Sequence, residues 1–143
     1  AAHQAMLETQ LRLFLINALR LLEKKRPNLN EEKVEDAPSR LVADYIALVE
    51  KNFKKTHAIA DYAEQLFVEA KSLAKHLQAH GYPTPKQVIY DRIMLQAKRD
   101  LRFSDKTVKE IAFDLGFEDP AYFSRLFSKQ EGRSPNAYRK VTA

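Results

Sequence analysis

The stretch "IAFDLGFEDPAYFSRLF", residues 111–127, decides the fold, because it places two short amphipathic segments on either side of a glycine. The small residue Ala112 lets a second helix approach the first closely, and Gly116 supplies the left-handed backbone that a tight turn requires. The apolar residues expected to fill the angle between the two helices are Ile111, Leu115, Phe117, Phe123 and Phe127. The stretch therefore predicts a helix-turn-helix.

The second helix of this unit keeps a polar face once its aromatic residues are buried. That face comprises Ala121, Tyr122, Ser124, Arg125, Ser128 and Lys129. Nothing in it supports covalent catalysis, but a helix of this kind can enter the major groove of DNA with its N-terminal residues at the base edges. Arg125 is the strongest candidate for base reading, because its guanidinium can bond both acceptors of a guanine edge.

The same unit occurs twice in the chain. "YAEQLFV", which starts at Tyr62, aligns with "IAFDLGF" at an offset of about 49 residues that lengthens to about 50 further on. Ala63 aligns with Ala112, and Leu73 aligns with Phe123. A first helix-turn-helix is therefore expected over residues 57–80.

Capping residues beside prolines mark the helix starts. Thr84, Asp119 and Ser134 each precede a proline, which is tolerated at the first helical position, and Thr107 with Glu110 forms a capping box. The expected helices cover residues 57–66, 70–80, 85–102, 107–115, 120–131 and 135–141, and an earlier one starts after an N-cap at Ser39. The prediction is an all-α fold in which two homeodomain-like helix-turn-helix units, 57–80 and 107–131, are joined by a long helix, 85–102.

The N-terminal part has a different character. Apolar residues at three- and four-residue steps predict an amphipathic helix over about residues 5–25. Its apolar stretch, residues 11–22, is too short to span a membrane and contains Arg12, Asn17 and Arg20. The charged segment 26–38 lies between two prolines and is expected to be a linker, so the DNA-binding domain is placed at 39–143. The amphipathic helix could mediate dimerisation or pack against another domain, and both alternatives stay open.

Composition sets the remaining bounds. The 143 residues include 45% hydrophobic residues, three glycines and six prolines, which favours a helical globular protein. The net charge of +5 suits a polyanionic partner. The chain has no cysteine, which excludes disulfides, thiolate metal sites and cysteine nucleophiles. No cofactor is expected.

Residues 107–139, "TVKEIAFDLGFEDPAYFSRLFSKQEGRSPNAYR", resemble the second helix-turn-helix of the AraC family of bacterial transcription regulators, whose signature runs eIA..lGF.d.syFsr.Fkk..G.sP..yR. Residues 90–101 match the helix that joins the two motifs in that family, and the resemblance covers about residues 40–141. The first motif departs from the pattern in three places. Phe67 replaces a glycine or small residue, Glu69 replaces a capping serine, and Leu77 replaces a phenylalanine.

The resemblance implies roles for named residues. Base-reading positions fall at Lys71, Ala74 and Lys75 in the first recognition helix, and at Ala121, Tyr122 and Arg125 in the second. Phosphate contacts fall at Ser124, Lys129 and Arg133. The resemblance further implies a cytoplasmic, sequence-specific DNA-binding transcription regulator, usually an activator, that binds double-stranded operator or promoter DNA, recruits RNA polymerase and carries an upstream effector-binding domain.

Three other interpretations fit parts of the sequence pattern. A paired helical unit can be a packing solution alone. Some methyl-transfer repair proteins carry a related helix-turn-helix pair, but they need a cysteine that this chain lacks, so an enzyme is not expected. The basic helices could instead bind an acidic protein. His76 and His80 have the spacing of a metal pair but no third ligand nearby, so no metal site is predicted, and Arg92 is expected in an internal ion pair.

Overall fold

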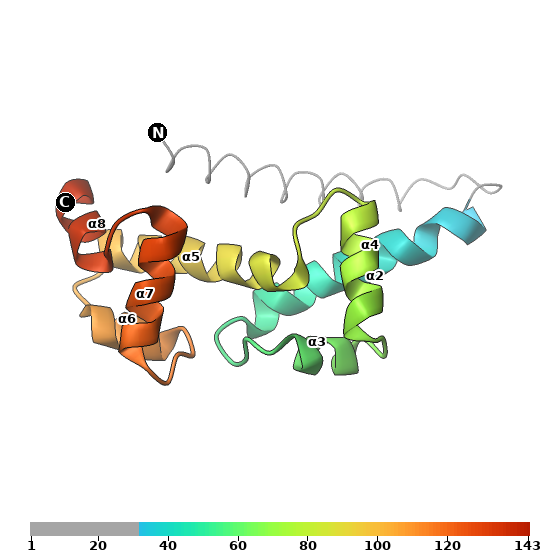
Figure 1. The fold of residues 1–143 in the computed structure, drawn as a ribbon, viewed down its shortest axis with the longest axis horizontal. Coiled ribbons are helices and arrows are strands. Elements are labelled where there is room, and N and C mark those ends of the chain that lie inside the picture. The colour runs from blue at the N-terminus through green and yellow to red at the C-terminus, as the bar shows by residue number, and fades with distance from the viewer. Residues whose placement is uncertain (1–31) are drawn as a thin grey trace.

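The computed structural model describes residues 32–143, with side chains from residue 40 onward. All the regular structure in this part is helical, in agreement with the predicted all-α class (Figure 1). The helices are α2 (Glu32–Asn52), α3 (Ile59–Gln65), α4 (Ala70–Ala79), α5 (Pro85–Phe103), α6 (Val108–Asp114), α7 (Pro120–Glu131) and α8 (Pro135–Thr142). None of these helices is long and apolar enough to cross a membrane. The amphipathic helix expected at residues 5–25 lies outside the described part.

The predicted helix starts at prolines are confirmed. Oxygen atoms of Thr84, Asp119 and Ser134 each accept a hydrogen bond from a backbone N–H in the first turn of α5, α7 and α8, at 3.2, 2.9 and 3.1 Å. Each of these helices has a proline in its first turn, where the missing N–H has no helical partner in any case. The N-cap of α6 is Thr107, which accepts from the N–H of Glu110 at 3.1 Å.

The start of α2 differs from the sequence prediction. The helix begins at Glu32, so Ser39 lies inside it and is not an N-cap, and residues 32–38 are helical rather than part of a linker. A proline removes one amide donor and kinks a helix, but neighbouring turns can continue past it. Helix α2 therefore continues through Pro38, although a proline locally favours the end of a helix.

Helix α2 forms the back of the first unit. It buries Val42, Tyr45, Val49 and Phe53, which recur at three- and four-residue steps and face α3, α4 and α5. The Tyr45 hydroxyl donates a 2.6 Å hydrogen bond to the Pro85 carbonyl, which ties α2 to the start of α5. The first unit and the connecting helix thus share one core.

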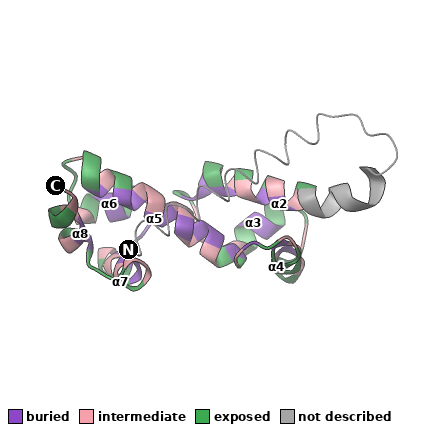
Figure 2. Cartoon of the chain, turned by 90° about the horizontal axis from the view of Figure 1, so that it is seen from above, coloured by how far each residue is buried: buried purple, intermediate pink, exposed green. Residues whose placement is uncertain are grey.

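Helix α5 runs between the two units and contributes to both (Figure 1). Its inward residues, which include Ile89, Ile93, Met94, Ala97 and Leu101, are almost fully buried (Figure 2). At its C-terminal end, Arg139 of α8 donates a 2.9 Å hydrogen bond to the Leu101 carbonyl. The helix is held at both ends and along its length.

The two units face the same way. Helices α4 and α7 run in the same direction in Figure 1, and both lie on one side of α5 in the perpendicular view of Figure 2. Each is the second helix of its helix-turn-helix. The fold therefore presents two equivalent helices on one face of the protein.

Candidate nucleic-acid interface

The turn of the second helix-turn-helix is a Schellman motif. The N–H of Phe117 donates to the Ala112 carbonyl at 3.0 Å, and the N–H of Gly116 donates to Phe113 at 3.1 Å. Gly116 has a φ of 88°, the left-handed conformation that the sequence predicted for it. The turn ends α6 sharply and sets the direction in which α7 leaves.

The turn of the first unit has the same hydrogen bonds. The N–H of Val68 donates to the Ala63 carbonyl at 3.0 Å, and the N–H of Phe67 donates to Glu64 at 3.1 Å. Phe67 takes the left-handed position with a φ of 56°, although it has a Cβ, and its side chain is 94% exposed. The departure from glycine at this position therefore leaves the turn unchanged and places the conformational cost on Phe67.

Both angles between helices are filled as the pattern requires. Ala63 and Ala112 are buried at the two crossings, where a larger side chain would separate the helices. In the second unit the aromatic rings form a continuous series, with centroids 5.2 Å apart for Phe117 and Phe123 and 6.0 Å apart for Phe123 and Phe127. The other residues expected in these cores, Leu73, Ile111 and Leu115, are also buried.

The residues suggested for base reading lie on α4 and α7. Ala121, Tyr122 and Arg125 are exposed on α7, and Lys71 and Lys75 are exposed on α4, whereas Ala74 is half-buried. Within residues 40–143, Arg125, Lys71 and Lys75 make no ion pair with an acidic side chain. Their charges are therefore available to an outside partner, and their contact with bases stays a prediction.

The positions suggested for phosphate contact are less uniform. Lys129 and Arg133 are exposed, but Ser124 is half-buried. Ser128, which the sequence placed on the same polar face, is half-buried as well. The Ser128 hydroxyl donates to the Ser124 carbonyl at 2.8 Å, so it is engaged with its own helix. Lys129 and Arg133 are the better placed residues for phosphate.

A direct contact joins the two units. His57, in the loop between α2 and α3, has its Nε2 atom 2.8 Å from the Leu115 carbonyl. A carbonyl only accepts, so Nε2 carries the proton and donates. The His57 ring also lies 4.6 Å from the Phe117 ring, and a Cβ on Gly116 would be 2.4 Å from the Lys54 carbonyl. We call these residues of the two loops the inter-unit contact.

Two side chains considered from the sequence have internal partners. Arg92 forms the expected ion pair, with Nη2 donating to Glu50 at 2.9 Å while its guanidinium lies over the Phe53 ring. The Nδ1 atom of His76 is 2.7 Å from the Ser72 carbonyl, and both His76 and His80 are half-buried. In the described residues no cluster of three or more potential metal ligands occurs.

Sequence reasoning missed the inter-unit contact and a groove beside α7 that includes Lys86 and Tyr90. Both bring together residues far apart in the chain, and neither belongs to the repeat that carried the prediction. Two exposed recognition-type helices on one scaffold, each set by the same turn, define a DNA-binding domain with paired helix-turn-helix units.

Comparison with known proteins agrees with this class. A family described as a helix-turn-helix domain matches residues 62–141. The transcriptional activator RhaS of Escherichia fergusonii is 31% identical over 122 residues, which is 85% of this chain and 44% of that protein. The uncharacterized transcriptional regulator YisR of Bacillus subtilis is 30% identical over 125 residues, 86% of this chain and 44% of that protein. The chain spans less than half the length of these relatives.

Solved structures show the same arrangement. The DNA-binding domain of AdpA, crystallised with a target DNA, is 26% identical with a TM-score of 0.64, over 70% of this chain and 90% of that one. The C-terminal domain of AraT, a response regulator of Geobacillus stearothermophilus, is 27% identical with a TM-score of 0.67. The match covers 73% of this chain and 88% of that one. The chain belongs to the AraC family of DNA-binding transcription regulators. The family and these neighbours are regulators rather than enzymes.

Proposed function

We propose that the chain binds double-stranded operator or promoter DNA through two adjacent major-groove segments, one occupied by α4 and the other by α7. The observation that carries this proposal is the placement of α4 and α7, in the same direction, on one face of α5 (Figures 1 and 2). The 19 residues of α5 extend about 28 Å, comparable with one turn of B-DNA at about 34 Å. Two helices held on such a spacer can meet the same face of a duplex.

The charges on these helices support unequal roles. The exposed Arg125 on α7 can bond the two acceptors of a guanine, whereas Lys75 at the equivalent place on α4 offers a single point charge. The N-cap residue of α4 is Glu69, which makes no side-chain capping bond and brings a negative charge close to any phosphate. We therefore assign the stronger base discrimination to α7.

The regulatory outcome that we propose is activation of transcription, with RNA polymerase as a partner. Support comes from RhaS, whose name describes a transcriptional activator. Because the chain spans under half of such relatives, we further propose that an effector-binding domain accompanies it in the whole protein. We place this activity in the cytoplasm.

The test is affinity selection on a duplex library with a random core, followed by sequencing. Binding by both units should enrich two unequal half-sites about 10 base pairs apart. Enrichment of a single half-site would refute the two-segment proposal, and no enrichment would redirect the function to a protein partner.

Point variants assign the half-sites. Arg125→Ala should lose about 5- to 150-fold in discrimination at one or two base pairs of one half-site, and Lys75→Ala should act on the other. Lys129→Ala is the control, because loss of a phosphate contact weakens selected and scrambled duplexes alike. Equal losses on both duplexes for Arg125→Ala would contradict its role in base reading.

A further inference from the structure

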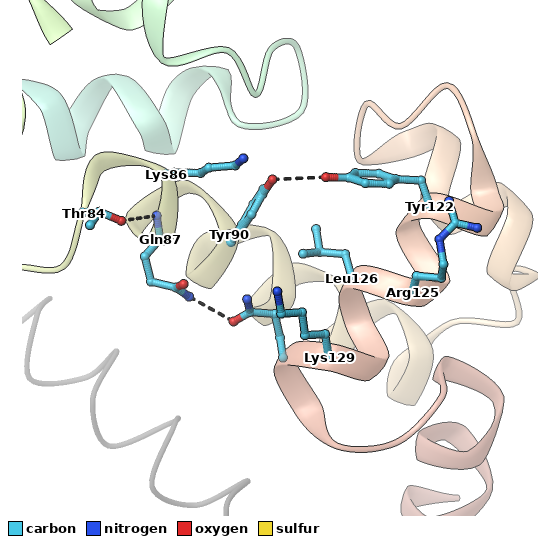
Figure 3. A pocket seen from close by; sticks show the side chains of 9 residues that line it. Thr84, Lys86, Gln87, Tyr90, Tyr122, Arg125, Leu126 and Lys129 are labelled. Atoms are coloured by element: carbon cyan, nitrogen blue, oxygen red, sulfur yellow. Dashed lines mark hydrogen bonds between the residues drawn. The ribbon is translucent and has the colours of Figure 1, made fainter.

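A groove of about 410 Å³ lies between the first turns of α5 and the exposed side of α7 (Figure 3). Lys86, Gln87 and Tyr90 contribute from α5, and Tyr122, Arg125 and Lys129 contribute from α7. The groove joins residues of the connecting helix, to which the motif assigns no DNA contact, with the helix expected to read bases.

The groove is strongly cationic. Lys86, Arg125 and Lys129 line it, and none of the nine described residues that surround it is acidic. Within residues 40–143 none of these three cations forms an ion pair. The nearby carboxylates have other partners, because Asp91 accepts from Gln87 at 2.7 Å and Glu131 pairs with Lys98 at 3.3 Å. The positive end of the α5 dipole adds to the same field.

The groove also holds a proton donor suited to an anion. The hydroxyls of Tyr90 and Tyr122 lie 3.4 Å apart, and one hydrogen bond between them uses only one of the two protons (Figure 3). A phenol is protonated at neutral pH, and burial followed by the bond to Tyr122 raises the pKa of Tyr90 further, to about 12. A free O–H beside Lys86 and Lys129 suits an oxyanion with several acceptor oxygens.

The place of the groove in the fold identifies its occupant. The start of α5 lies between α4 and α7, and the two helices project on the same side of it (Figures 1 and 2). On a duplex that α4 and α7 enter in successive major-groove segments, a strand of the backbone must pass between them. We propose that this groove binds a phosphodiester of that intervening backbone through Lys86 and the Tyr90–Tyr122 pair. The inference rests on the two-segment binding proposed above.

The experiment combines a protein variant with a change in the DNA. Each phosphate between the two half-sites of the selected duplex is replaced, one at a time, by an uncharged methylphosphonate, and affinities are measured by fluorescence anisotropy. One or two central replacements should weaken binding about ten-fold, and Lys86→Ala should cost a similar factor on the unmodified duplex. Combined at that position, the two changes should cost no more than either alone, because they remove the same contact.

Two further variants sharpen the result. Tyr90→Phe, which removes only a hydroxyl, should show the same non-additivity at the same phosphate. Lys51→Ala, which removes an exposed charge from α2, is the matched control and should be additive at every position. For Lys86→Ala, the slope of the logarithm of the binding constant against the logarithm of the salt concentration should become shallower by about 0.9. Additive losses for Lys86→Ala at every phosphate overturn the proposal.

Failure of the phosphate contact can be told apart from failure of the proposed DNA-binding function. Arg125→Ala tests base reading on the same duplexes, and its failure leaves a Lys86 coupling intact. If no duplex is selected, inorganic phosphate is titrated into the protein while the ring signals of Tyr90 and Tyr122 are followed by NMR. A saturable shift that Lys86→Ala abolishes would assign the groove to a free phosphate ligand, and no shift would leave it without an anion. Either result overturns the backbone assignment.

Discussion

Replacing Gly116 by alanine should destabilise the protein far more than the same change at Gly132. Both glycines have left-handed backbones, with φ of 88° and 78°, and this conformation costs a residue with a Cβ about 1–2 kcal/mol. Around Gly132 no atom beyond its own chain neighbours lies within 4 Å of the new Cβ. At Gly116 the new Cβ would be 2.4 Å from the Lys54 carbonyl oxygen and 3.3 Å from Nε2 of His57. Only Gly116 combines strain with overlap.

The overlap sets the size of the difference. The Lys54 oxygen is a backbone atom, so the loop itself must move, and forced shifts of this kind cost about 1–3 kcal/mol. The total expected for Gly116→Ala is therefore about 2–5 kcal/mol, against about 1–2 kcal/mol for Gly132→Ala. The movement should also lengthen the 2.8 Å contact between His57 and the Leu115 carbonyl.

Urea denaturation followed by circular dichroism measures both variants against the parent chain. The free energies of unfolding in water give the two costs, and an unchanged m-value shows that the denatured state is the same. Subtracting the cost at Gly132 removes the backbone strain and leaves the cost of the inter-unit contact. Equal costs for the two variants would refute the reasoning, because the loops would then separate freely.

Three further changes test other parts of the structure. Phe67→Gly should stabilise the protein by about 1 kcal/mol in thermal unfolding, since it relieves a left-handed phenylalanine whose ring is 94% exposed; a lower Tm would contradict the strain. Lys98→Met should destabilise it by about 3 kcal/mol by leaving Glu131 buried and unpaired, and Lys98→Met with Glu131→Leu should recover most of the loss. Burial raises the pKa of Tyr62 to about 12, whereas the phenol of the unfolded chain titrates at about pH 10. The stability that the protonated Tyr62 contributes to the folded state is therefore complete below about pH 10 and is lost as the pH rises through 12. Tyr62→Phe should flatten the fall in stability across this interval, and an unchanged slope would exclude Tyr62 as its source.

Much of the fold follows from local signals in the sequence. The caps at Thr84, Asp119 and Ser134 bind their own helix starts, so neighbouring residues suffice to predict them. The left-handed turn at Gly116 is predicted in the same way. The repeat then locates the first unit, even where Phe67 replaces the usual glycine, because the buried pattern around the turn is kept.

The errors and omissions have a physical origin as well. Pro38 and Ser39 carry the local signals of a linker and a cap, yet α2 continues through both. The inter-unit contact depends on His57 meeting Leu115, and the groove depends on Lys86 meeting α7, so each requires the three-dimensional path of α5. The residues suggested for base reading lie on α4 and α7, but whether they contact bases depends on a partner molecule and stays a prediction.

The inter-unit contact fixes the position of one helix-turn-helix relative to the other. On the function proposed above, α5 and the two touching loops hold both recognition helices at one separation and one rotation. A single base pair inserted between the half-sites shifts the second one by about 3.4 Å and turns it by about a tenth of a helical turn. The loops cannot follow, so the duplex must bend or one helix must leave its groove. Binding sites should therefore diverge in sequence more readily than in spacing, and the DNA, not the protein, should supply the flexibility.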